Sequence, residues 1–64
     1  MKIVTVSVRH VGQSFGCVGI VRDARTGRRL GVTRLYPYGF DGPAHAGAVA
    51  IAESKGWRVA GGAS

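Results

Sequence analysis

The sequence has few of the features by which very small domains are stabilised covalently or by metal. Cys17 is the only cysteine among 64 residues, so no disulfide can form within the chain. The two histidines, His10 and His45, lie far apart and lack the ligand spacing of a zinc site. We therefore expect no metal and no other cofactor, and packing or dimerisation must stabilise the fold.

Long apolar segments are also missing. The longest apolar stretch, 46–52, is far shorter than the roughly 20 residues that cross a bilayer. The first residues lead directly into an alternating pattern and do not resemble a signal peptide. We expect a cytoplasmic chain without membrane contact, with one compact domain over 1–60 and a flexible tail over 61–64.

Acidic residues are scarce, with three Asp and Glu against nine Lys and Arg, which gives a formal net charge of +6. Arginine outnumbers lysine, and its planar guanidinium binds phosphate or carboxylate in a bidentate manner. The codon bias of a GC-rich genome is an alternative explanation for the choice of arginine, although it does not explain why acids are so few. The composition favours an anionic partner.

Alternation predicts strands at the start of the chain. Over 2–11, Val4, Val6 and Val8 share one face and polar residues the other, which is typical of a half-buried strand. A turn at 12–14 leads into a second strand over 15–23, where Gly16 and Gly19 indicate a bulge or the close approach of another backbone or a ligand.

A third strand is predicted over 28–36, after a turn at 23–27 that starts with Asp and ends with Gly. Leu30 and Val32 should face the core and Thr33 the solvent. The same alternation would bring Arg34 to the core side, so either a bulge shifts the phase or the strand extends beyond the helix there.

One helix follows an irregular connection at 36–40. Asp41 is expected to cap a helix that begins at Gly42 and Pro43 and runs to Lys55, with Gly56 as the residue that stops it. The helix presents small side chains that allow close approach to a sheet, and three aromatic residues should fill the remaining gaps. The small side chains are Ala44, Ala48 and Ala52, and the aromatic residues are Phe15, Phe40 and Trp57.

These elements predict an α+β domain of β-β-β-α order, an antiparallel sheet with the helix packed on one face and a possible short edge strand at 58–60. The order is similar to the three-stranded sheet plus helix of the plant APETALA2-type and integrase arm-binding DNA domains. The similarity is one of topology, and no residues are transferred from those families.

Arginines and tyrosines form the candidate binding site. The hairpin of strands two and three is basic, and a two-stranded ribbon of this kind can enter the DNA major groove. Rings beside arginine make a stacking platform for bases or a protein hot spot, although we expect Phe40 and one tyrosine to be buried. The candidate residues are Arg9, Arg22, Arg25, Arg28, Arg29, Arg34, Tyr36 and Tyr38.

A catalytic interpretation would use Cys17 or Ser14 as nucleophile and His10 or His45 as base. The only orienting group near a histidine in sequence is Asp41, four positions before His45, and ordinary helix electrostatics explains that pair. Cys17 fits better as a small core residue. We expect no enzyme activity.

The leading hypothesis is a nucleic-acid-binding module that uses the arginine-rich hairpin and the open face of the sheet. The alternative is a small interaction protein, such as a host-directed phage inhibitor or a regulator, that docks on an acidic surface of a larger protein. Homodimerisation is expected with either, because the core is small and sheet edges are left open.

Overall fold

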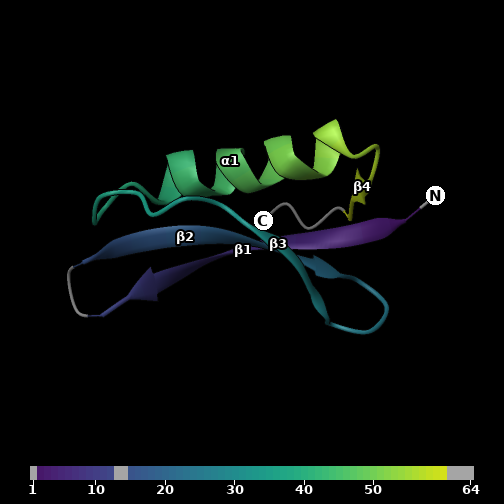
Figure 1. Ribbon diagram of the computed structural model, residues 1–64, viewed down its shortest axis with the longest axis horizontal. Coiled ribbons are helices and arrows are strands. Elements are labelled where there is room, and N and C mark those ends of the chain that lie inside the picture. The colour runs from purple at the N-terminus through teal and green to yellow at the C-terminus, as the bar shows by residue number, and fades with distance from the viewer. Residues whose placement is uncertain (1, 13–14, 61–64) are drawn as a thin grey trace.

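The computed structural model describes residues 2–12 and 15–60, which form one mixed four-stranded sheet and one helix. The strands are β1 (Ile3–Val11), β2 (Gly16–Asp23), β3 (Arg29–Val32) and β4 (Arg58–Val59), and the helix is α1 (Asp41–Ser54). The sheet order is β3-β2-β1-β4, with α1 along one face (Figure 1). The predicted α+β class and the short C-terminal strand are confirmed. The sheet is not purely antiparallel, because β4 pairs with β1 in parallel.

The predicted alternation of the first strand is confirmed. Val4 is fully buried and Val6 and Val8 are half-buried, while the polar residues between them are exposed. Val6 lies opposite Val21 of β2, and Val4 lies beside Val59 of β4. The two central strands therefore place valines on the face that α1 covers, where their burial drives folding.

The third strand differs from its prediction. It is shorter, Arg29–Val32, and within it the register shifts between Val21 and Arg22, which leaves Leu30 as an extra residue opposite them. The shift reverses the phase of the alternation. Gly31 therefore faces α1, Val32 is 47% exposed and Thr33 is half-buried, where we expected Val32 inside and Thr33 outside. The later chain touches β2 again through a bridge between Tyr36 and Cys17.

Small residues set the distance between α1 and the sheet. Ala44, Ala48 and Ala52 recur every four residues and are fully buried, as predicted. A Cβ atom at Gly19 of β2 would overlap the carbonyl oxygen of Ala44 and lie 2.8 Å from the Cβ of Ala48. The predicted close approach at Gly19 is confirmed, and the approaching backbone is that of α1.

The prediction for α1 is wrong at its N-terminal end and confirmed at its C-terminal end. Asp41 does not cap the helix: it is the first helical residue, Phe40 precedes it, and no side chain makes a capping hydrogen bond. The C-terminal end is as predicted, with Gly56 at φ +75°. The amide of Gly56 donates to Glu53 O at 3.0 Å, and that of Trp57 donates to Ala52 O at 2.9 Å, which is a Schellman motif.

The aromatic residues fill less of the core than predicted. Trp57 is half-buried and packs against the cluster of Val4, Val21, Ala48 and Ala52. Phe15 and Phe40, however, are 78% and 50% exposed, so the prediction that they fill gaps is wrong. The alanines and glycines bring α1 close enough to the sheet that no gap of aromatic size remains between them. No helix within 2–12 and 15–60 is long and apolar enough to span a bilayer.

Candidate nucleic-acid interface

No helix of the described residues covers the face of the sheet opposite α1 (Figure 1), although Ile20, which projects from this face, is only 2% exposed. Strand register identifies the side chains of this face, because directly paired residues project on the same side. Three rows cross it: Thr5–Arg22–Arg29, Ser7–Ile20–Val32 and Arg9–Val18. Ile3 and its β4 partner Arg58 add a fourth. We call these residues the open face, and a hydrogen bond from Arg22 Nη1 to Ser7 Oγ at 3.4 Å is consistent with the assignment.

Positive charge is concentrated on the open face, and no Asp or Glu side chain of the described residues projects from it. It carries Arg9, Arg22, Arg29 and Arg58. All three acidic residues of the chain lie elsewhere: Asp23 is the register partner of Val4 on the helix side of the sheet, and Asp41 and Glu53 belong to α1. The face therefore has a positive potential that no nearby carboxylate offsets.

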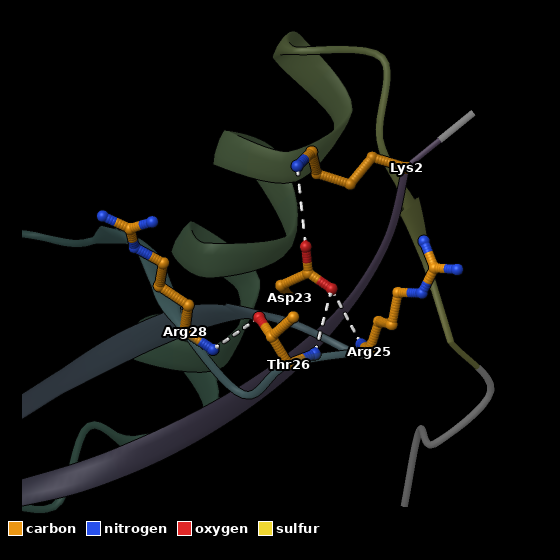
Figure 2. Close-up of polar contacts among 5 residues, drawn as sticks. All are labelled: Lys2, Asp23, Arg25, Thr26 and Arg28. Carbon is orange, nitrogen blue, oxygen red and sulfur yellow. Dashed lines mark hydrogen bonds and ion pairs between the residues drawn. The ribbon is translucent and has the colours of Figure 1, made fainter.

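The turn between β2 and β3 is organised by polar contacts of Asp23 (Figure 2). Its Oδ1 accepts hydrogen bonds from the amides of Arg25 at 2.7 Å and Thr26 at 3.4 Å, and its Oδ2 lies 3.6 Å from Lys2 Nζ. The hydrogen bond from the Arg25 amide is the main reason why the pKa of Asp23 lies below its usual value. Thr26 Oγ1 in turn accepts from the amide of Arg28 at 3.2 Å.

This turn directs two of the predicted site residues outward. The side chains of Arg25 and Arg28 extend away from the turn and from each other (Figure 2), and both residues are exposed. The predicted hairpin cluster is thus divided: Arg22 and Arg29 lie side by side on the open face, and Arg25 and Arg28 lie at its end. Arg58 could not be predicted from the sequence, because only its pairing beside Ile3 assigns it to this face.

The other predicted residues lie away from the open face. Tyr36 is half-buried against α1, since a Cβ at Gly47 would lie 2.8 Å from its hydroxyl. The Arg34 guanidinium lies 5.5 Å from the centre of the Tyr36 ring, so Arg34 is exposed and not in the core. Tyr38 is 59% exposed and its ring centre lies 5.9 Å from that of His10. The structure therefore joins Tyr36 to Arg34 but places neither tyrosine beside the arginines of the open face.

Exposed apolar side chains gather at the end of the molecule where α1 begins. A Cβ at Gly16 would touch Leu35, Tyr38 contacts His10, and Phe40 directly precedes α1. Among the described residues, five of the seven exposed large hydrophobic side chains lie here, and we call them the apolar end. They are Val11, Phe15, Leu35, Tyr38 and Phe40. Exposed apolar groups of this density are typical of contact surfaces.

Three of the candidate catalytic residues also meet near this end. His10 and Cys17 are register partners, and His10 Nε2 lies 3.1 Å from Asp41 Oδ1, whereas sequence spacing had suggested His45 as the partner of Asp41. Cys17 is fully buried, and its Sγ lies 3.8 Å from Pro37 O. Burial raises the pKa of the Cys17 thiol and the charge of Asp41 raises it further, so the thiolate needed for nucleophilic attack is disfavoured. Ser14 lies outside the described residues.

The rest of the described chain adds no second chemical centre. No group of three or more His, Cys, Asp or Glu side chains within residues 2–12 and 15–60 is placed to hold a metal ion. Comparison with protein-family models, curated proteins and solved structures finds no match to this chain.

Proposed function

We propose that this chain is a small, non-enzymatic nucleic-acid-binding module whose contact surface is the open face of the sheet, extended by the β2–β3 turn. The observation that carries the proposal is the separation of charge: four arginines lie on the open face, and all three Asp and Glu side chains lie off it. A polyanion approaching this face meets only attraction. Arginine at these positions suits phosphates and guanine edges alike.

Duplex nucleic acid fits this face better than a single strand. Proteins that bind single strands without sequence preference stack bases on aromatic side chains, and the described residues of the open face include none. A curved sheet with arginines along its strands instead supplies phosphate contacts and side chains that reach base edges in the major groove. The exposed Arg25 and Arg28 of the turn can extend the contact along the backbone.

The test is fluorescence anisotropy with a labelled duplex over a range of salt concentrations. The variant Arg9→Gln/Arg22→Gln removes two open-face charges, and Lys2→Gln/Lys55→Gln is the matched control. Both lysines lie near Trp57, at 6.0 Å from its ring centre, on the helix side. Each variant lowers the formal charge of +6 by two. A third variant, Arg25→Gln/Arg28→Gln, measures the contribution of the turn.

The expected result is a loss confined to the open face. Each phosphate contact contributes about 0.9 to the slope of log K against log salt, so losing two lowers the slope by about 1.8 and the affinity at 0.1 M salt by about 60-fold. The lysine control should retain the wild-type slope. Equal losses in the two variants would mean that only net charge matters, and no binding by the wild type would refute the proposal.

The second candidate function is docking on a larger protein, and the apolar end favours it. Phe15, Tyr38 and Phe40 are three of the five aromatic residues of the chain and all are at least half exposed. Aromatic anchors surrounded by arginine are typical of protein hot spots. A partner that is retained after nuclease treatment, and lost with Phe15→Ser but not with Arg9→Gln/Arg22→Gln, would favour this function over nucleic-acid binding.

A further inference from the structure

The open face contains a pair of like charges that the fold places directly opposite each other. Arg22 of β2 and Arg29 of β3 are register partners beside the register shift, so they are neighbours on adjacent strands. Like charges in this position destabilise a sheet. The pairing results from the register shift that leaves Leu30 as an extra residue, since without the shift Leu30 would lie opposite Arg22.

No Asp or Glu side chain of the described residues pairs with Arg22 or Arg29. Asp23, adjacent to Arg22 in sequence, projects to the other side of the sheet, where it accepts from the amides of the turn and pairs with Lys2. Asp41 contacts His10, and Glu53 lies on α1. The neighbours of the pair on the open face are instead hydroxyl groups, with Thr5 in register with Arg22 and Ser7 Oγ 3.4 Å from its Nη1.

We infer that Arg22 and Arg29 together hold a single phosphodiester group, as a two-arginine clamp on the open face. Two guanidinium forks side by side can each bond two oxygens of one phosphate, and its negative charge removes the repulsion between them. Thr5 is placed beside the clamp as an additional hydroxyl donor. The inference rests on the proposed function, to which it adds the position of one anchored phosphate.

A shared phosphate has a measurable consequence that two separate contacts lack. Because one phosphate releases one set of counterions, Arg22→Gln/Arg29→Gln should lower the salt slope for a duplex by about 0.9, whereas two independent contacts would lower it by about 1.8. The reference is the variant Arg9→Gln/Arg22→Gln. Arg22 of β2 lies opposite Thr5 of β1, and Arg9 is four residues, or about 13 Å, further along β1, so the two arginines contact different phosphates. The variant Arg22→Lys/Arg29→Lys keeps the charge without the forks and should retain the slope but bind more weakly.

A second measurement needs no nucleic acid. In a titration with inorganic phosphate followed by NMR of the arginine Nε–Hε groups, the signals of Arg22 and Arg29 should shift together with one dissociation constant, and Arg29→Gln should abolish the shift of Arg22. A slope loss near 1.8 for Arg22→Gln/Arg29→Gln, or independent shifts in the titration, would overturn the clamp while the duplex binding of the wild type still supports the proposed function. If the wild type binds no duplex but the two signals shift together, the clamp stands and the proposed function fails.

Discussion

The contact between Gly19 and α1 allows a sharp test of the packing. Gly19→Ala would make a Cβ overlap the carbonyl oxygen of Ala44, which is helix backbone and cannot turn aside as a flexible side chain can. The whole helix must move, and overpacking of this kind typically costs about 1–3 kcal/mol, with backbone contacts at the upper end. For a domain of this size, about 2–3 kcal/mol corresponds to a loss of roughly 8–24 °C in Tm.

The matched control is Gly31→Ala, the same change on the helix face of the neighbouring strand. Its Cβ would lie 3.5 Å from Ile51 Cγ2, an ordinary van der Waals distance. It should be neutral or stabilise by about 0.4–1 kcal/mol, because alanine restricts the unfolded chain. Thermal unfolding followed by circular dichroism measures both. If Gly19→Ala melted at the temperature of Gly31→Ala, the described contact between α1 and β2 would be incorrect.

Three further predictions concern Asp23, Cys17 and the apolar end. Because the pKa of Asp23 is lower in the folded state, its charge stabilises the fold above its usual pKa near 3.8, and this contribution is lost as the pH falls through the lower folded value. Urea unfolding from pH 5 to pH 2 should therefore show a steeper decline for the wild type than for Asp23→Asn, and parallel declines would contradict the role of the turn. The buried Cys17 thiol, with its raised pKa, should react with a thiol reagent only at the rate of unfolding, so that added denaturant accelerates the reaction; rapid reaction of the native protein would contradict its burial. If the expected homodimer forms through the apolar end, Phe15→Ser/Phe40→Ser should be monomeric in sedimentation equilibrium at concentrations where the wild type is dimeric, and a wild type that is monomeric at high micromolar concentration would remove the expectation.

Local patterns predicted those parts of the fold that depend on neighbours in sequence. The alternation of Val4, Val6 and Val8 and the alanines of α1 indicated their buried faces, and Gly56 indicated where the helix stops. The phase of β3 could not be predicted, because the register shift at Leu30 depends on how two strands pair and not on either sequence alone.

The candidate site was predictable in residue type more than in arrangement. Charge and sequence proximity identified Arg22, Arg25 and Arg29, but they could not separate the open face from the turn. Arg58 belongs to the same face only because β4 joins the sheet beside β1, a contact between distant parts of the chain. The tyrosines were assigned to binding on proximity to Arg34, whereas Tyr36 packs against α1 instead.

The position of β4 also has a consequence for how the domain folds. Val4 and Val59 are neighbours in the sheet although nearly the whole chain separates them, and both contribute to the cluster beneath α1. Contacts between such distant residues form late and slowly, because a long loop must close first. During synthesis the cluster cannot be completed until residue 59 has emerged, so we expect the domain to acquire its native structure after translation of this segment and not progressively along it.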